Sequence, residues 1–508
     1  MSLNLTAAGL ADQKAWEAAG YALPSYDREA MITRTKESPC WVHFGAGNIF
    51  RAFQANTAQE LLNNGTFDRG VIVAEGFDTE IIRDMYQPHD NLSILVTLKA
   101  DGSVEKTIVG SIAESLAADT ADSPDFARLK EIFTKDSLQM ATFTITEKGY
   151  SLKNGAGELL PSVAADFAAG PSSVTSYMGK VASLLYERFL AGEKPVAMVS
   201  TDNCSHNGEK LSLALTAYAS AWEENKLVQP GFLSYLQNPE KVSFPWTMID
   251  KITPRPHKIV EESLEKDGIE GMTPIVTSKN TFIAAFVNAE RPQYLVVEDK
   301  FPNGRPALEK AGVYMTDRET VNKTERMKVT TCLNPLHTAM SVYGCMLGYD
   351  LICAEMKDED IVALIKRLGY VEGLPVVVDP KILNPKAFID EVIDYTLANA
   401  PYPEPVLAFC GAVALQAALA GRKVRDPQDN RTAIQNAAGV VTVNPATKVL
   451  VRTVPAYWRF DAQMGYQLTS KIRISANIQN LTDKTYYSQA YTSHYATIAP
   501  GRDRKSVV

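Results

Sequence analysis

The sequence has few histidines and cysteines and no long uninterrupted hydrophobic run. Its six histidines and six cysteines form no H-E-x-x-H and no C-x-x-C pattern, so no metal site is predicted. The cysteines show no paired spacing and are expected to be reduced thiols. The longest uncharged apolar segment, residues 406–421, contains Gln416 and is too short to span a bilayer, which favours a buried helix.

A dense basic stripe is also absent, and no signal peptide is expected. The chain carries 51 Lys and Arg against 59 Asp and Glu, a net charge of −8, which disfavours nucleic acid as a partner. Asp12, Lys14 and Glu17 interrupt the N-terminal region, so we expect a cytoplasmic protein with no membrane partner. A chain of 508 residues is too long for one core and predicts two or three domains.

A strand–turn–helix–strand pattern lies near the N-terminus. Residues 41–44 form a short apolar strand, and residues 45–51 contain two glycines. A helical pattern then runs from Phe53 to Leu62. Residues 70–74 form a second apolar strand that ends at Glu75. This succession is typical of dinucleotide-binding folds.

Gly45 and Gly47 are the glycines of this turn. Without side chains they let the backbone turn tightly and approach a pyrophosphate, which then lies at the N-terminus of the following helix. The third glycine of the usual pattern is missing, because Phe50 occupies its position. The turn alone therefore leaves two interpretations open, a dinucleotide site or a tight turn without a ligand.

Two acidic residues follow the second strand. Glu75, or Asp78 just beyond it, is expected to accept hydrogen bonds from the ribose hydroxyls of adenosine. The same charge would repel a 2′-phosphate, so NAD is favoured over NADP as the cofactor.

The rest of the chain has α/β character first and helical character later. The expected elements are strands at 92–98, 104–112, 140–145 and 196–200, a helix opened by Ser123 and Pro124, and a helix at 172–190. The strands at 140–145 and 196–200 would deliver Thr146, Glu147 and Asn203 to the edge of the sheet where ligands bind. An ordinary polar loop is the alternative at Thr146 and Glu147.

These patterns predict an α/β fold class with three parts. A Rossmann-type dinucleotide-binding domain is expected over residues 1–285, and a mostly helical, incomplete substrate domain over 286–438, beginning within 282–298. A short tail with strand-like alternation is expected over 439–508.

The segment at 327–340 sets polar groups into one apolar helical pattern. Lys328 lies between apolar neighbours, and Asn334 and His337 follow it. A lysine is seldom buried without a function, and desolvation lowers the pKa of a lysine so that it can act as a general base near neutral pH. The alternative is an amphipathic helix with an exposed lysine and a packed histidine.

Together, these segments resemble the mannitol dehydrogenase family of long-chain polyol dehydrogenases, and within it the D-mannonate oxidoreductase (fructuronate reductase) branch. The resemblance runs from the first residues to about Pro405, roughly four fifths of the chain. Its motifs are W-V-H-F-G-A-G-N-I-F-R at 41–51, T-I-T-E-K-G-Y at 144–150, S-T-D-N at 200–203, S-F-P-W-T-M-I-D at 243–250, and the segment with Lys328, Asn334 and His337.

The resemblance implies hydride transfer between a nicotinamide and a secondary alcohol of a sugar acid or polyol, without a metal. Lys328 would be the general base, and His337 would orient a substrate hydroxyl. Asn203 and Asn334 would stabilise the developing alkoxide. Asp250 would either bind a substrate hydroxyl or cap a helix. The implied cofactor residues are Gly45, Gly47, Asn48, Arg51, Glu75, Asp78, Thr146 and Glu147.

The spacing of the lysine segment departs from the family. The family has its lysine five residues before the asparagine, whereas Lys328 precedes Asn334 by six. One extra residue turns Lys328 by about 100° around an α-helix, roughly opposite His337. Three interpretations follow: a π-bulge, favoured by Pro335, that absorbs the residue, a different helix start in this branch, or a base other than Lys328.

The C-terminal part also departs from the family. The expected helical region with a substrate-facing arginine is not found, and from about Val440 short alternating strands follow. Residues 480–487, N-L-T-D-K-T-Y-Y, resemble the last strands of a TonB-dependent outer-membrane receptor. A few strands cannot close a barrel, so we interpret the chain as a dehydrogenase joined to a foreign tail. A native C-terminal domain is the alternative.

The predicted function is NAD-dependent interconversion of D-mannonate and D-fructuronate. The alternatives are another polyol or uronate dehydrogenase, such as mannitol 2-dehydrogenase or tagaturonate reductase, or an inactive fusion with an outer-membrane receptor fragment. The expected partner is a small-molecule sugar acid or polyol, with no nucleic acid and no membrane.

Overall fold

The computed structural model describes residues 3–99, 103–291, 293–349 and 352–393, and five strands between residues 462 and 507. The chain divides into two compact units. The first contains Met1–Lys328 and Val377–Glu391, and the second contains Val329–Val376 and the strands of the tail.

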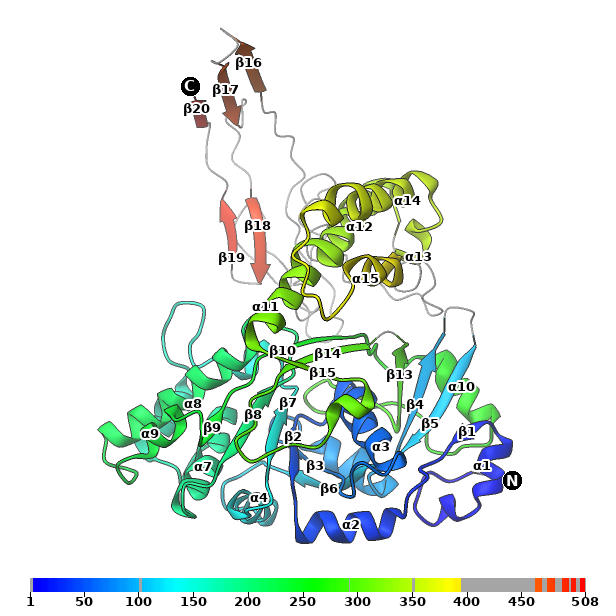
Figure 1. The fold of residues 1–508 in the computed structure, drawn as a ribbon, viewed down its shortest axis with the longest axis vertical. Helices are drawn as coiled ribbons and strands as arrows, with labels where there is room; N and C mark the ends of the chain where they lie inside the picture. Colours follow the sequence, from blue (N-terminus) through cyan, green and yellow to red (C-terminus); the bar gives the residue numbers. More distant parts are fainter. Residues whose placement is uncertain are drawn as a thin grey trace. The chain divides into compact units, whose positions relative to one another are not determined.

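A six-stranded parallel sheet forms the centre of the first unit (Figure 1). Its strands, in spatial order, are β6 (Ile112–Ala117), β3 (Val71–Glu75), β2 (Trp41–Phe44), β7 (Met140–Phe143), β8 (Val196–Ser200) and β9 (Val242–Ser243). This is the doubly wound order of dinucleotide-binding folds, with the direction of winding reversed between β2 and β7. Ligands of such sheets bind at the carboxyl ends of the strands beside that reversal.

Alternate residues of the central strands pack into two apolar layers. Val42 and Phe44 belong to a layer with side chains of α4 (Pro124–Thr134), α7 (Tyr177–Leu190), α8 (Asn207–Glu224) and α9 (Phe232–Gln237). Trp41 and Val73 belong to the opposite layer, with side chains of α3 (Ala55–Asn63). Because both faces are covered, every residue of β2, β3, β7 and β8 is buried, which is why these strands appear in the sequence as continuous apolar runs.

The predicted start of the helix at Ser123 and Pro124 is confirmed. The Ser123 hydroxyl accepts a hydrogen bond from the Phe126 backbone N–H, and Pro124 is the first residue of α4. The helix expected over 172–190 begins later, at Tyr177, because Ser176 caps it by accepting from the Gly179 N–H.

Two smaller sheets and one hairpin complete the first unit. The order β1 (Tyr21–Ala22), β5 (Val104–Val109), β4 (Ser93–Leu98) and β13 (Phe286–Glu290) makes one sheet, and the order β10 (Thr247–Lys251), β14 (Gln293–Glu298) and β15 (Tyr314–Thr316) makes the other. The strands β11 (Ile275–Val276) and β12 (Phe282–Ile283) form the hairpin. The remaining helices are α1 (Gln13–Ala18), α2 (Arg28–Glu37), α5 (Thr146–Gly149), α6 (Pro161–Ala169), α10 (Lys258–Lys266), α11 (Arg318–Met327) and α15 (Pro385–Glu391).

Two expectations about this unit need correction. The single strand predicted over 104–112 is two strands in different sheets, because Gly110 hydrogen-bonds Gln59 and the Ser111 hydroxyl hydrogen-bonds the Ala55 carbonyl, which turns the chain. The helical domain expected from within 282–298 does not begin there. That segment contains β12, β13 and β14, and β13 pairs in parallel with β4. The predicted domain boundary at residue 285 therefore lies inside the first unit.

The second unit contains a small helical part and strands of the tail. Its helices are α12 (Asn334–Leu347), α13 (Ile352–Glu355) and α14 (Glu359–Lys366), followed by a π-helical segment at Arg367–Gly373. The tail strands are β16 (Ala462–Gln467), β17 (Arg473–Gln479), β18 (Tyr487–Thr492), β19 (Tyr495–Ile498) and β20 (Asp503–Val507). Residues 394–461 and 480–486 lie outside the described part of the chain, so the interpretation of the tail stays a prediction.

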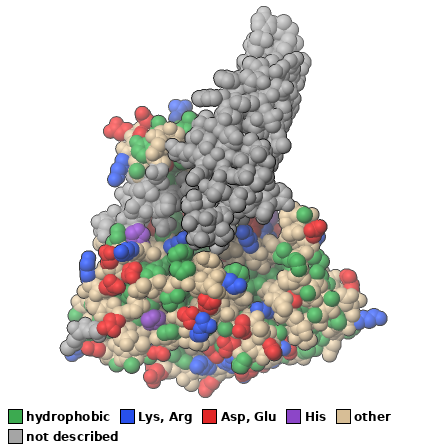
Figure 2. Space-filling model, turned by 180° about the vertical axis from the view of Figure 1, so that it is seen from behind, with side chains coloured by type: hydrophobic (Ala, Val, Ile, Leu, Met, Phe, Trp, Pro, Cys, Tyr) green, Lys and Arg blue, Asp and Glu red, His purple; other side chains and the backbone are tan. Residues whose placement is uncertain are grey.

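None of the helices among the described residues is long and apolar enough to cross a membrane. On the face of the first unit shown in Figure 2, acidic and basic side chains are interspersed.

Candidate active site

The glycine turn after β2 has the geometry expected of a dinucleotide loop. Gly45 has a φ of +109°, and a Cβ at this position would lie 2.2 Å from the Thr144 carbonyl oxygen, so only glycine fits. A Cβ at Gly47 would meet no atom within 4 Å. The backbone at Gly47 is therefore open to close approach by a ligand, next to the helix that begins at Asn48.

Phe50 shows how the fold accommodates the missing third glycine. The residue is fully buried, and its ring stacks on the His43 ring with centroids 4.2 Å apart. The helix is π-helical over Phe50–Gln54 before α3 begins, a wider turn at the position where a glycine normally permits close helix–strand packing.

Glu75 holds two loops together. One carboxylate oxygen accepts a hydrogen bond from the Ala46 N–H at 2.8 Å, and the other accepts from the Phe77 and Asp78 N–H groups at 2.8 and 3.1 Å. Because backbone donors already occupy both oxygens, Glu75 acts mainly by fixing the glycine turn relative to the loop after β3.

Asp78 has one carboxylate oxygen without a partner in the part of the chain that the structure describes. Its side chain is only 3% exposed, and Oδ2 accepts a hydrogen bond of 2.6 Å from the Thr277 hydroxyl. Oδ1 is buried and has no hydrogen-bond partner among the described residues. A buried carboxylate oxygen without a donor is unfavourable, and a ribose hydroxyl is a donor of the required kind.

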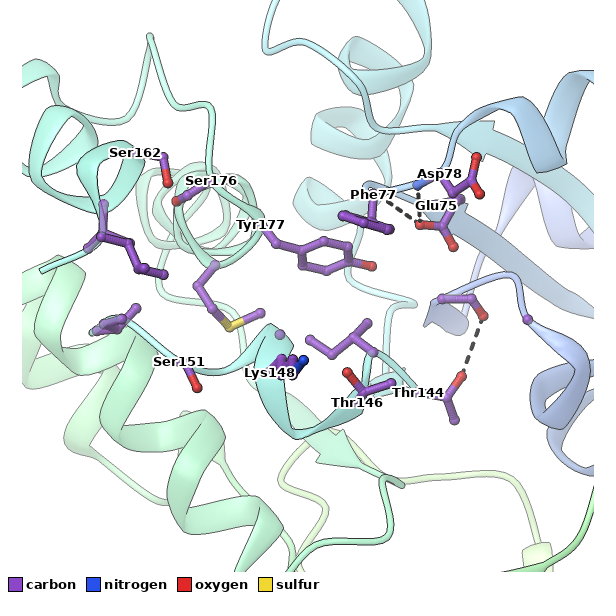
Figure 3. A pocket seen from close by; sticks show the side chains of 18 of the residues that line it. Glu75, Phe77, Asp78, Thr144, Thr146, Lys148, Ser151, Ser162, Ser176 and Tyr177 are labelled. Carbon is purple, nitrogen blue, oxygen red and sulfur yellow. Dashed lines mark hydrogen bonds between the residues drawn. The ribbon is translucent and has the colours of Figure 1, made fainter. Parts of the chain in front are cut away.

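A cavity of about 690 Å³ brings these groups together (Figure 3). Of the predicted cofactor residues, its lining includes Gly45, Gly47, Glu75, Asp78 and Thr146. The hydroxyl end of the Tyr177 ring points to the side of the cavity that Glu75 and Asp78 form (Figure 3). The open space at Gly47 and the unpaired Asp78 oxygen fit the pyrophosphate and the adenosine ribose of a dinucleotide.

Three predicted cofactor residues do not line this cavity. Arg51 is fully buried, and its guanidinium donates to the Ala284 carbonyl at 2.6 Å and to Asn48 Oδ1 at 2.8 Å. Burial lowers the pKa of Arg51 to about 10. These contacts give Arg51 and Asn48 a structural part at the helix start, and their predicted contact with the cofactor stays a prediction. The exposed Glu147 carboxylate pairs with Lys210 at 2.5 Å, and Glu147 is not among the residues that line the cavity.

Asp202 fixes the loop that carries Thr146. Its carboxylate accepts hydrogen bonds from the Ile145 and Thr146 N–H groups at 3.0 and 2.8 Å and from the Tyr150 hydroxyl. Thr146 has a φ of +63°, an unusual conformation for a β-branched residue, which these bonds stabilise. Burial raises the pKa of Asp202 above its usual value.

A second cluster surrounds Lys328. The residue is 2% exposed, and its Nζ lies 2.7 Å from the Ile249 carbonyl, 3.0 Å from Asp250 Oδ1 and 3.3 Å from Asn203 Oδ1. Three oxygen acceptors match the three N–H donors of an ammonium group. The structure thus brings together Lys328, Asn203 and Asp250 from three distant parts of the sequence.

Asp250 lies in strand β10, so the helix-capping alternative is wrong. Its side chain is 21% exposed, and its carboxylate pairs with Lys328. A charge pair that is partly open to solvent can hold the lysine in place and still be reached by substrate.

The sequence predicted one continuous helix for the lysine segment, and the structure shows a break in it. A π-helical turn occupies Lys328–Cys332, which agrees with the first of the three interpretations of the spacing, and α12 begins at Asn334 after a break at Leu333. Asn334 and His337 belong to the second unit, where the His337 N–H donates to the Leu333 carbonyl. Their part in the site stays a prediction.

Sequence patterns did not point to Thr277. It contacts Asp78 across a separation of 199 residues and lies in a short hairpin without a motif. A pattern within one segment cannot reveal such a contact.

Known proteins resemble this chain in sequence and fold. The family model described as the mannitol dehydrogenase Rossmann domain matches residues 40–310. A D-mannonate oxidoreductase of Thermotoga maritima is 52% identical over 404 residues, which covers 79% of this chain and 74% of that protein. A polyol:NADP oxidoreductase of Gluconobacter oxydans is 28% identical over 377 residues, covering 73% of this chain and 70% of that protein.

Two solved structures share the fold. The ternary complex of Pseudomonas fluorescens mannitol 2-dehydrogenase with NAD and D-mannitol has a TM-score of 0.64 at 26% identity and covers 82% of this chain and 80% of that one. A substrate-free D-sorbitol dehydrogenase has a TM-score of 0.65 at 24% identity, covering 79% and 77%. With the family model over half of its length and a relative at 52% identity, this chain belongs to the mannitol dehydrogenase family and is an oxidoreductase built on that family's Rossmann domain.

Proposed function

We propose that the protein is an NAD-dependent D-mannonate oxidoreductase, which interconverts D-mannonate and D-fructuronate. The observation that carries the proposal is the buried Lys328 ammonium, held beside Asn203 just beyond the carboxyl end of β8. The 52% identity with the Thermotoga maritima D-mannonate oxidoreductase supports the choice of substrate.

Residues of the large cavity would hold NAD. Gly47 leaves space for the pyrophosphate, and Asp78 Oδ1 would accept a hydrogen bond from the adenosine ribose. When bound, NAD accepts a hydride from the alcohol carbon, and NADH returns one to the carbonyl carbon.

Lys328 would move the proton that balances the hydride. In the reduction of D-fructuronate, the ammonium donates a proton to the carbonyl oxygen as that oxygen becomes a hydroxyl, and in the oxidation of D-mannonate the neutral amine takes the proton back. Asp250 and the Ile249 carbonyl hold two of the three N–H groups. The contact with Asn203 is the longest of the three, so a substrate oxygen can replace it at the least cost.

Asn203 would stabilise charge on the same substrate oxygen. Its Oδ1 accepts from Lys328, so the group that it offers to a substrate is the Nδ2 donor. Asn334 is proposed as the second amide donor, and His337 as the group that orients a substrate hydroxyl, on the basis of the family pattern. The π-helical turn at Lys328–Cys332 supports this assignment, because it absorbs the extra residue between Lys328 and Asn334.

A cytoplasmic location and the absence of nucleic-acid and membrane partners are also proposed. The net charge of −8 and the interspersed surface charges in Figure 2 support the proposal that nucleic acid is not a partner.

The test is NADH consumption by the full chain with D-fructuronate, D-tagaturonate and D-fructose, measured side by side. We expect the highest kcat/KM with D-fructuronate. A higher value with D-fructose would assign the protein to mannitol oxidation, and a higher value with D-tagaturonate would assign it to the other uronate. No turnover of any of the three, with NADH binding intact, would contradict the proposed activity.

A further inference from the structure

The two acidic residues after β3 differ in what they can offer a ligand. All carboxylate oxygens of Glu75 face backbone N–H donors, whereas Asp78 has one occupied oxygen and one buried oxygen without a donor. Of the two residues, only Asp78 has a carboxylate oxygen that no donor among the described residues reaches, and the position of that oxygen depends on how the Asp78 carboxylate is turned.

Thr277 determines that orientation. The Thr277 hydroxyl donates to Asp78 Oδ2 at 2.6 Å, and the Thr277 Oγ1 in turn accepts a hydrogen bond from the Thr281 N–H at 3.1 Å. The Thr281 N–H thus fixes the direction in which the Thr277 hydroxyl points its proton. Thr277 and Asp78 are both buried, so water does not compete for this bond.

The hairpin that carries Thr277 is attached to the loop after β3 at neighbouring points. The Ser278 N–H and hydroxyl both hydrogen-bond Glu80, the former at 2.9 Å. The Lys279 Nζ lies 5.7 Å from the centre of the Phe77 ring, and Thr281 lines the cavity. The turn between β11 and β12 therefore forms part of the wall of the cavity at its acidic end.

We infer that Thr277 is a positioning residue for dinucleotide selectivity: its hydroxyl occupies Asp78 Oδ2 and so presents Oδ1 to a ribose 2′-hydroxyl. The inference rests on the ribose role proposed for Asp78. Without the Thr277 hydroxyl, the carboxylate gains rotational freedom and loses a donor, so the hydrogen bond to the ribose is formed at a greater cost. The Asp78 charge, which repels a 2′-phosphate, is retained.

The experiment measures equilibrium binding of NADH and of NADPH to the full chain by isothermal titration calorimetry. Loss of a hydrogen bond to a charged group predicts that Thr277→Val weakens NADH binding by about five- to tenfold, and NADPH binding by less than about twofold. Thr277→Ser keeps the hydroxyl and should restore the NADH affinity to within about twofold of the wild type. Thermal melts without dinucleotide confirm that each variant is folded.

Two further variants separate the possible causes. Ser278→Ala removes the adjacent side-chain contact, to the half-buried Glu80, and should leave the ratio of NADH to NADPH affinity unchanged. Equal losses of NADH and NADPH affinity in Thr277→Val would mean that the hairpin only shapes the cavity, which overturns the inference. Asp78→Ala should lower the ratio. If it does not, the ribose role of Asp78 fails. If it does and Thr277→Val leaves the ratio unchanged, the inference about Thr277 alone fails.

Discussion

Lys328 and Asp250 form an ion pair with 3.0 Å between Nζ and Oδ1, and the carbonyl of Ile249, the residue before Asp250, accepts a second hydrogen bond from the same Nζ at 2.7 Å. Strand β10 thus holds the lysine through a side chain and through its backbone. A lysine that is 2% exposed is tolerated because these oxygens replace the water that it loses.

Replacement of Lys328 tests its chemical role. Lys328→Ala should reduce the rate of the chemical step by roughly two to four orders of magnitude, because proton transfer loses its positioned group. NADH affinity should stay within about twofold, since Lys328 does not line the dinucleotide cavity. Single-turnover kinetics and NADH titration measure the two quantities. A chemical rate near that of the wild type would place the base elsewhere.

Replacement of Asp250 tests whether the pair acts as a unit. Asp250→Asn keeps the size of the side chain and removes its charge, and we expect kcat/KM to fall about tenfold or more because Lys328 is held less firmly. The double variant Lys328→Ala/Asp250→Asn should be no slower than Lys328→Ala alone, since the two residues share one function. Additive losses would show that Asp250 acts independently, for example on a substrate hydroxyl.

The two glycines of the turn should respond differently to the same substitution. Gly45→Ala introduces a Cβ 2.2 Å from the Thr144 carbonyl at a φ of +109°, so the melting temperature should fall markedly. Gly47→Ala meets no atom within 4 Å, so the fold should tolerate it, while NADH binding weakens because the methyl group occupies the space of the pyrophosphate. Thermal melts with and without NADH distinguish the two effects. Unchanged NADH affinity in Gly47→Ala would place the pyrophosphate elsewhere.

His43 should make the stability depend on pH. The ring is fully buried between the hydroxyls of Thr142 and Thr144, and burial lowers its pKa from 6.5 to about 3. Below pH 6.5 the unfolded chain binds a proton that the folded protein does not. The contribution of His43 is therefore fully present above pH 6.5 and is lost as the pH falls towards 3, by up to about 1.4 kcal/mol per pH unit.

Urea unfolding of wild type and His43→Gln between pH 7 and pH 4 measures this contribution. The variant has no titrating ring, so its free energy of unfolding should fall less steeply with decreasing pH, whatever its stability at pH 7. Identical slopes would show that His43 is protonated in the folded protein as readily as in the unfolded chain.

Local patterns in the sequence predicted the dinucleotide-binding unit well. The strands β2, β3 and β8 and the start of α4 at Ser123 and Pro124 agree with prediction, because a continuous apolar run and a capping group are both visible within a few neighbouring residues. The π-helical turn at Lys328–Cys332 is one of the three interpretations that the unusual spacing and Pro335 leave open. Prediction failed where two strands of different sheets follow each other closely, as at Val109 and Ile112, since local periodicity does not say which sheet a strand joins.

The sequence by itself determined the family, the glycine turn and the types of residue that carry the proposed chemistry, because these are written in short contiguous motifs. Only the tertiary structure decided which acidic residue keeps a free oxygen and what holds the lysine. The bond from Thr277 to Asp78 spans 199 residues, and the bond from Lys328 to the Ile249 carbonyl spans 79. Contacts of this kind arise when distant segments pack together, and no pattern within either segment encodes its partner. Burial then removes the water that would compete for each hydrogen bond, which makes the bond selective.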